Sequence, residues 1–396
     1  MDKNKNIDLQ QYNAFRFVIP FFVANGFIYG LNSLYYSFIP LYLEQVCKFD
    51  EFQRGILLSI GPLIAIPALI FFGIMCDKAK YKNNVLVFIL IVSAALFYAI
   101  SLSTSFVYLV IIFAFMMFFL SPYGSLIDSL SLEYAMATRV KYGPMRIMGS
   151  FAFGVLSLTL TFLTQFNISI IFISFIIMAA ISITAVKKMP PIQGHARENK
   201  KISAGSFKEF FADKTVVALF TFLFIGQFSF GAYNNFMPNF MISELKLPQW
   251  LWGLNVFVTI IGELVFFIKF DYFFKKFTIR QITVFAVITQ VLRYLSFWLI
   301  PNAFGILLTS LFTGSFCTII NYSASYYINR TAKKEFRTSA QTLLYAVSFY
   351  IARFLSGFAG GLIANITSFG ILMMCCAILN IILLVFARFA SLKQPE

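Results

Sequence analysis

Several ionisable side chains lie inside apolar stretches of this sequence: Asp128, Arg146, Glu263, Arg293 and Arg353. An ionised group at the centre of a membrane-spanning helix costs about 2.5 to 3.5 kcal/mol on insertion scales, so such groups usually face a partner or a water-filled cavity. A carboxylate and a guanidinium can neutralise each other there and still offer donors and acceptors to a polar ligand. These residues therefore predict a polar pathway through a membrane-embedded protein.

The surrounding sequence is that of a polytopic membrane protein. Of its 396 residues, 60% are hydrophobic and 12% are charged, which is far from the average of soluble domains. Apolar runs of roughly 18 to 25 residues can cross a hydrocarbon core of about 30 Å as helices. Twelve such runs are present, at 15–43, 54–75, 85–102, 106–132, 144–162, 168–186, 216–241, 251–270, 282–300, 304–328, 339–363 and 369–386. The expected fold class is therefore an all-α membrane protein with twelve transmembrane helices.

One long hydrophilic stretch divides these runs into two equal sets. We expect an N-terminal six-helix bundle at 1–187, a cytoplasmic linker at 188–213 and a C-terminal six-helix bundle at 214–396. The ends of the second and eighth runs, FFGIMCDKAKYKNN and FFIKFDYFFKKFTIR, each place an Asp beside a basic cluster. Such echoes favour an internal duplication, an architecture in which transporters bind substrate near the midplane between the repeats.

The basic residues are distributed unevenly along the chain. The net charge is +15, and lysine and arginine concentrate in alternate connections and in the linker. By the positive-inside rule, this places both termini and the linker in the cytoplasm. We expect a multi-pass protein of the cell (inner) membrane, in contact with the lipid bilayer and with no nucleic-acid partner.

The connection after the second run carries a motif, Gly73-Ile-Met-Cys-Asp77-Lys78, followed by further basic residues. Here the chain resembles the major facilitator superfamily, whose members have this signature in the same loop. The resemblance implies two six-helix bundles that alternate access by rocking. Gly73 would let neighbouring helices approach closely, and Asp77 and Lys78 would form contacts that break during gating. The alternative is an ordinary charge cluster at the membrane surface.

The fifth run opens with YGPMRIMGS, which contains Arg146, and Asp128 lies in the fourth run. This narrows the resemblance to the branch that holds the lactose permease, an oligosaccharide:proton symporter, and the phenylpropionate permease. In those relatives the acid and the arginine reach the central cavity. The resemblance therefore implies that Asp128 and Arg146 bind substrate. The alternative is a structural ion pair between helices.

Charges in the second half match positions that carry charge in the same branch. Arg293 is a candidate substrate ligand, and Glu263 and Arg353 are candidates for coupling, because conformation can change the proton occupancy of a buried carboxylate. A fixed salt bridge between Glu263 and either arginine is equally expected. Asn25, Asn234 and Asn235 are further substrate-binding candidates, although each could instead bond across helices.

One departure from the branch affects coupling. The tenth run has neither the histidine nor the glutamate that the lactose permease uses for proton coupling. If protons are coupled, Glu263 or Asp128 must carry them, and sodium coupling or simple facilitation stays open. Aspartates of the branch are also missing from the seventh run.

The sequence as a whole favours a secondary active transporter for a small polar organic solute, namely a sugar, a nucleoside or a small carboxylate. No phosphate-binding loop, dinucleotide fingerprint, zinc motif or nucleophile elbow is present, so we expect no enzyme activity, no cofactor and no metal. We expect a monomer. The alternatives are a lipid or drug exporter and a non-transporting membrane receptor of the same fold.

Overall fold

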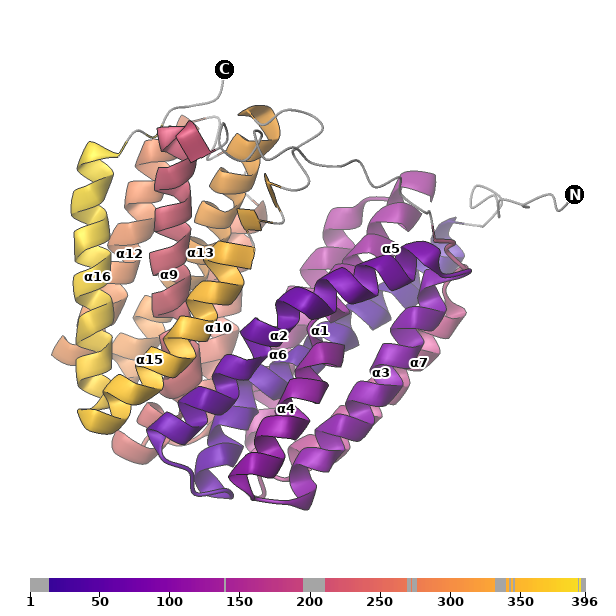
Figure 1. Cartoon of the computed structure of the whole chain (residues 1–396), viewed down its shortest axis with the longest axis horizontal. Coiled ribbons are helices and arrows are strands. Elements are labelled where there is room, and N and C mark those ends of the chain that lie inside the picture. Colours follow the sequence, from indigo (N-terminus) through magenta and orange to yellow (C-terminus); the bar gives the residue numbers. More distant parts are fainter. Residues whose placement is uncertain are drawn as a thin grey trace, which may run out of the picture. The chain divides into compact units, whose positions relative to one another are not determined.

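In a computed structural model, the described residues fold mainly into long helices (Figure 1). The structure describes residues 14–138, 140–194, 211–268, 272, 276–331, 340–341, 343–344, 346–390 and 392. The first helices are α1 (Ala14–Gln45), α2 (Glu51–Lys78), α3 (Lys82–Ala99), α4 (Phe106–Leu120), α5 (Tyr123–Thr138), α6 (Tyr142–Thr164) and α7 (Ile170–Lys188). They are followed by α9 (Lys214–Asn239), α10 (Trp250–Ile268), α12 (Ile279–Leu299), α13 (Ala303–Thr331), α15 (Ala352–Ile366) and α16 (Phe369–Phe389).

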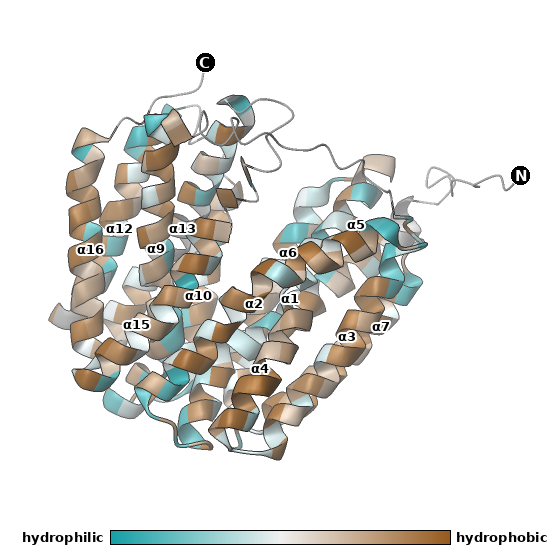
Figure 2. Cartoon of the chain, viewed as in Figure 1, coloured by the Kyte–Doolittle hydropathy of each residue, from teal (hydrophilic) through white to brown (hydrophobic). Residues whose placement is uncertain are grey.

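The helices occupy the apolar runs of the sequence. Each predicted span coincides with a helix in the described part of the chain, and α4 and α5 together fill the span predicted at 106–132. Among the described residues, nine helices are long and apolar enough to cross a membrane. Figure 2 shows that the helices are hydrophobic along much of their length. The prediction of an all-α membrane fold is confirmed.

Several spans are irregular where the sequence analysis expected continuous helices. Ser121 and Pro122 separate α4 from α5, because proline has no N–H to continue the helical hydrogen-bond ladder, although Ser121 keeps helical backbone angles and Phe106–Thr138 is one candidate membrane span. A π-helical turn, Phe240–Glu244, extends α9 just after Pro238, and another, Ala346–Ile351, precedes α15. Such π-helical turns are frequent at functional sites.

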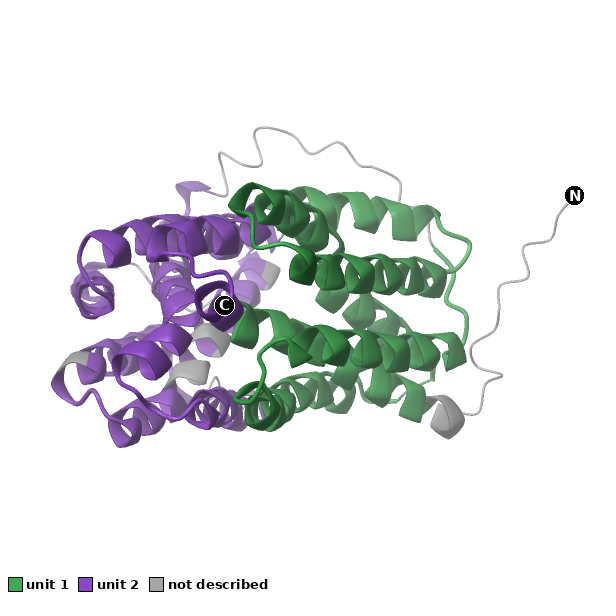
Figure 3. Cartoon of the chain, turned by 90° about the horizontal axis from the view of Figure 1, so that it is seen from below, with its two compact units in different colours: residues 1–39, 64–198 green, residues 40–63, 199–396 purple. Residues whose placement is uncertain are grey.

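The helices form two compact units, coloured separately in Figure 3. The first comprises Met1–Ile39 and Ile64–Glu198, and the second comprises Pro40–Leu63 and Asn199–Glu396. The second unit thus contains the end of α1 and the start of α2, which the sequence analysis assigned to the N-terminal bundle. Most of the linker predicted at 188–213 lies outside the described residues.

Aromatic pairs join the helices of the first unit. The rings of Phe97 on α3 and Phe175 on α7 stack with centroids 4.1 Å apart. Phe21 on α1 stacks on Tyr134 of α5 at 4.4 Å. Offset stacking at these distances adds to the stabilisation from burying the rings. The second pair holds α1 against α5, the helices that carry Asn25 and Asp128.

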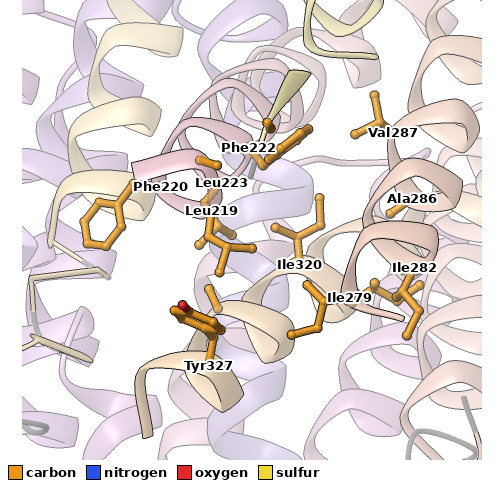
Figure 4. Close-up of a cluster of buried hydrophobic side chains, with 14 of the residues drawn as sticks. Leu219, Phe220, Phe222, Leu223, Ile279, Ile282, Ala286, Val287, Ile320 and Tyr327 are labelled. Atoms are coloured by element: carbon orange, nitrogen blue, oxygen red, sulfur yellow. The ribbon is translucent and has the colours of Figure 1, made fainter. Parts of the chain in front are cut away.

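A hydrophobic cluster forms the core of the second unit (Figure 4). Leu219 and Phe222 come from α9, Ile282 from α12 and Ile320 from α13, and Leu383 of α16 belongs to the same cluster. All five side chains are at least nine-tenths buried. This packing fixes the rotation of α12 about its axis, which in turn determines where Gln290 and Arg293 lie.

Candidate functional site

The first unit brings the predicted pair of charges together. Nε of Arg146 on α6 lies 3.5 Å from Oδ2 of Asp128 on α5, and the side chains are 29% and 31% exposed. Nη1 of Arg146 also donates to the hydroxyl of Ser150 at 3.1 Å, one turn later on α6. Oδ1 of Asp128 is buried and has no hydrogen-bond partner among the described residues. The pair is neutral as a whole and still offers an acceptor.

Tyr29 on α1 completes this pair, and the sequence analysis missed it. Its hydroxyl donates to Oδ2 of Asp128 at 3.0 Å, and the guanidinium carbon of Arg146 lies 4.4 Å from the centre of its ring. A cation over a tyrosine face is attracted by the ring quadrupole. Tyr29 therefore contacts both charges at once and links α1 to α5 and α6. A tyrosine in an apolar helix follows no motif, so the sequence carried no signal for this role.

Gly149, in the YGPMRIMGS motif, makes room for that tyrosine. A Cβ built at Gly149 would lie 2.5 Å from Cδ2 of Tyr29, which is closer than van der Waals contact permits. At Gly143, earlier in the same motif, a Cβ would meet no described atom within 4 Å. The two motif glycines thus differ, and of the two only Gly149 lies against the ring that Arg146 contacts.

Asn25 lies in the same unit, but its side chain is buried between helices. It is fully buried, and its amide donates to the backbone oxygen of Phe21 at 2.8 Å and to the hydroxyl of Ser131 on α5 at 2.9 Å. These bonds tie α1 to α5, as the alternative interpretation of this residue expected. Its Oδ1 has no partner among the described residues.

Arg293 in the second unit has a different environment. Its side chain is fully buried, and its guanidinium carbon lies 3.8 Å from the ring centre of Tyr233 and 5.6 Å from that of Phe297. Within the described part of the chain, nothing accepts a hydrogen bond from its Nε, Nη1 or Nη2. A buried cation without an acceptor is costly, so this arginine requires a partner that the described residues do not supply.

The ring under Arg293 is held by other helices. The amide of Asn255 on α10 donates to the Tyr233 hydroxyl at 2.6 Å, and Ser310 on α13 donates to Asn255. The rings of Tyr233 and Phe297 stack with centroids 5.6 Å apart. This network fixes the aromatic surface beneath the guanidinium, and its hydrogen bonds end at the tyrosine hydroxyl.

The remaining predicted residues of the second unit are spread over three helices. Nε of Arg353 on α15 donates to the side-chain oxygen of Gln227 on α9 at 3.2 Å, and its guanidinium carbon lies 3.9 Å from the ring centre of Phe349. Asn234 and Asn235, on α9, and Glu263, on α10, are all partly exposed.

The motif after the second span differs in one respect from what the sequence analysis expected. We expected Gly73 to let helices approach closely, yet a Cβ there would meet no atom of the described residues within 4 Å. The expected close packing of helices at Gly73 is therefore absent from the described part of the structure. Asp77 and Lys78 lie at the end of α2. The backbone N–H of Gly194 donates to the carbonyl of Ala79 at 3.1 Å and so caps that helix end.

A polar cluster that the sequence analysis did not single out lies in the second unit. Arg54 on α2 is almost fully buried, with Nη1 3.1 Å from Oε2 of Glu44 on α1 and Nη2 2.6 Å from Oε1 of Glu51. The amide of Asn239, near the end of α9, donates to Glu44 and, at 3.1 Å, to the carbonyl of Pro40. The cluster joins the α1–α2 connection to α9. The sequence pattern that could have predicted this cluster is an arginine preceded by two glutamates across a short loop.

Glycines bring α2 and α15 together beside that cluster. A Cβ at Gly55 would lie 2.5 Å from the carbonyl oxygen of Gly357 and 2.8 Å from Cα of Gly361. A Cβ at Gly361 would lie 2.7 Å from the carbonyl oxygen of Glu51. Small residues at helix interfaces allow this approach of backbones. Gly357 and Gly361 therefore mark a close contact between α15 and α2.

Solved structures share this fold. The nucleoside transporter NupG superimposes with a TM-score of 0.82 at 17% identity, covering 94% of this chain and 98% of that one. A D-xylose-proton symporter gives a TM-score of 0.72 at 13% identity over 97% of this chain and 100% of that one. The expected major facilitator fold is thereby confirmed.

Sequence relatives extend the comparison. YwbF of Bacillus subtilis (strain 168), an uncharacterized transporter, is 24% identical over 353 residues, which is 87% of each chain. A putative proline/betaine transporter of Staphylococcus aureus (strain MSSA476) is 30% identical over 146 residues, covering 36% of this chain and 31% of that protein. The model of the MFS_1 like family matches residues 22–375. The chain therefore belongs to the MFS_1 like family, a group of multi-pass membrane transporters and not of enzymes.

Proposed function

We propose that this protein is a secondary active transporter that moves a small polar organic solute across the membrane by alternating access. The family and the fold support transport in general. The observation that carries the proposal to a site is the pair of Asp128 and Arg146, which lies within membrane-spanning helices and is neither exposed nor fully sealed. Intramembrane charges of this kind mark substrate or ion pathways.

The chemistry of the pair defines the kind of solute. Asp128 retains an acceptor oxygen, Oδ1, without a partner among the described residues, and the Tyr29 ring provides an apolar face beside it. Hydroxyl or amine groups would donate to the carboxylate, while the guanidinium would donate to carbonyl or carboxylate oxygens. Sugars, nucleosides and small carboxylates offer these groups. The names of the similar transporters mention nucleosides, D-xylose and proline or betaine, which are also small polar solutes.

The distribution of charge supports an orientation. The basic connections would face the cytoplasm with both termini, in the cell (inner) membrane, and the protein would work as a monomer. Asp77 and Lys78, at the end of α2, would take part in gating on that face, and Gly73 lies one turn before them. The motif around Arg146 supports kinship with the branch of the lactose and phenylpropionate permeases.

Coupling is proposed to use protons, with sodium as the competing ion. Glu263 would be the proton-responsive carboxylate and Arg353 would balance its charge, because the tenth span has no histidine or glutamate. Uptake driven by an imposed pH gradient, and abolished by a protonophore, would support protons. Uptake that instead requires an inward sodium gradient would identify sodium, and not protons, as the coupling ion.

The test is transport by the purified protein in proteoliposomes. Radiolabelled uridine, D-xylose, betaine and benzoate would be supplied under proton or sodium gradients. We expect uptake of at least one solute, and we expect it to fall roughly 100-fold in Arg146→Ala, since the substitution removes both the donors that would bind the solute and the counter-charge of the partly exposed Asp128. Ser129→Ala, on the same helix as Asp128, is the control for folding and reconstitution. Uptake that is unchanged in Arg146→Ala would remove this pair from the binding site.

A further inference from the structure

We infer that the second unit contains a carboxylate-binding site in which Arg293 and Gln290 hold the acidic group of the solute. This inference rests on the proposed function and deepens it, because it selects anionic solutes from the classes named above. It starts from hydrogen-bonding groups that are buried and unused.

Two neighbouring side chains on α12 carry five of these groups. Arg293 and Gln290 are both fully buried. In the part of the chain that the structure describes, Nε, Nη1 and Nη2 of Arg293 and both amide atoms of Gln290 have no hydrogen-bond partner. Residues three apart on a helix lie on the same face, one turn from each other. The unused groups of Gln290 and Arg293 are therefore presented on one face of α12.

Buried polar groups of native proteins are nearly always hydrogen-bonded. A buried guanidinium needs more than hydrogen bonds, because burial of its charge must also be offset. Water would satisfy the donors and leave the charge uncompensated in a low-dielectric interior. A bound anion supplies the acceptors and the opposite charge together.

The surroundings of Arg293 specify the shape of that anion. Tyr233 covers one face of the guanidinium at 3.8 Å, and the bond from Asn255 to the Tyr233 hydroxyl fixes the ring. The donors that remain lie in the guanidinium plane, where a planar carboxylate binds through two parallel hydrogen bonds. The amide of Gln290 would add a further donor.

The count of charges also favours a carboxylate over a phosphate. Arg293 contributes one positive charge, and Gln290 and Tyr233 are neutral. One carboxylate balances that charge, whereas a phosphate carries up to two negative charges near pH 7. The pair of Asp128 and Arg146 is already neutral within its own unit, so it does not supply a counter-ion of its own to the solute.

The experiment measures binding to the purified protein in detergent with matched pairs of probes. Glucuronate is compared with glucose, lactate with lactamide, and benzoate with benzamide. A ligand that binds only the folded state raises the melting temperature by mass action. We expect the acid of at least one pair to raise the melting temperature and its neutral counterpart to have little effect.

Variants of α12 locate the effect. Arg293→Gln should weaken binding of the acid roughly 10- to 100-fold, the range for a hydrogen bond to a charged group, and should remove the preference for acids. Arg280→Gln is the matched control, because Arg280 lies at the start of the same helix, is exposed and donates to the backbone of Arg388. Its preference for acids should equal that of the wild type.

Gln290→Glu keeps the test decisive if Arg293→Gln does not fold. This variant places a carboxylate one turn from Arg293, so it should raise the melting temperature without ligand and abolish the response to added acids. The inference is overturned if neutral probes bind as well as acids, if inorganic phosphate or chloride alone stabilises the protein, or if Gln290→Glu still binds acids normally.

Failure of this inference is distinguishable from failure of the proposed function. Arg146-dependent uptake of a neutral sugar or nucleoside, with no preference for acids, would retain transport and overturn the carboxylate site. Binding of acids at Arg293 with no flux of any solute under either gradient would retain the site and overturn transport.

Discussion

Each unit of this protein places an arginine over a tyrosine ring, but among the described residues only one of these two arginines has a counter-ion. Arg146 lies 4.4 Å from the ring of Tyr29 and 3.5 Å from Asp128. Arg293 lies 3.8 Å from the ring of Tyr233 and has no acceptor among the described residues. Aromatic stacking is thus common to both, and charge neutralisation within the protein is not. The difference indicates that a cation–π contact positions a guanidinium and leaves its charge to be balanced by something else.

The largest effect is expected from breaking the neutralised pair. Asp128→Asn and Arg146→Gln should each lower the free energy of unfolding by about 1 to 2 kcal/mol, less than for a fully buried pair because both side chains are partly exposed. The double variant should lose less than the sum, and all three should lose uptake roughly 100-fold. Thermal unfolding and uptake measure the cycle. Strictly additive losses would mean that the two charges do not interact.

A somewhat smaller effect is expected from disturbing the ring between those charges. Gly149→Ala would force Tyr29 to move, since the new Cβ would lie 2.5 Å from Cδ2 of the ring, and overpacking costs about 1 to 3 kcal/mol. We expect uptake to fall about 10-fold, because misplacement of a binding group is expensive. Gly143→Ala is the matched control in the same helix and should leave uptake unchanged. Equal effects of the two substitutions would contradict the role of Tyr29.

The unneutralised arginine should respond in the opposite direction. Without ligand, Arg293→Gln should raise the free energy of unfolding by about 1 kcal/mol, because it removes a buried charge that no described residue balances. Arg280→Gln, at the exposed start of α12, should change it by less than about 0.5 kcal/mol. Thermal unfolding of the three proteins in detergent is the measurement. Destabilisation by Arg293→Gln would mean that the guanidinium is already paired, and the comparison between the units would fail.

The smallest effect separates hydrogen bonding from stacking. Tyr29→Phe keeps the ring and removes the bond to Asp128, at a cost of about 0.5 to 1 kcal/mol. Tyr29→Leu removes the ring as well and should cost about 0.5 to 1 kcal/mol more through the lost cation–π contact. Thermal unfolding of both variants in detergent compares them. If both variants unfold at the same temperature, the ring makes no separate contribution at Arg146.

Much of the fold could be predicted because apolar run length and charge placement report directly on the membrane. The run at 106–132 was predicted as one span, although Pro122 divides it into α4 and α5. The π-helical turn Phe240–Glu244 was not foreseen, since its cause lies in local backbone geometry beyond Pro238. Periodicity and composition do not encode such details.

The candidate site was predicted in part. The resemblance of the motif predicted that Asp128 and Arg146 lie close to each other, and the structure places them together. Tyr29 could not be found, because one tyrosine among many in an apolar helix has no distinguishing pattern. The sequence also could not predict that Arg293 has no counter-ion among the described residues. It gives the types of charged residues but not which of them lie within hydrogen-bonding distance of each other.

The glycine contact between α2 and α15 has a consequence for movement. Where Gly55 meets Gly357 and Gly361, the nearest atoms are main chain except for the hydroxyl of Ser59 beside Gly357. Because few side-chain atoms lie between the two backbones, a small change in the spacing of the two helices requires little side-chain rearrangement. A valine at residue 55 would collide with the main chain of α15 and hold the two helices farther apart.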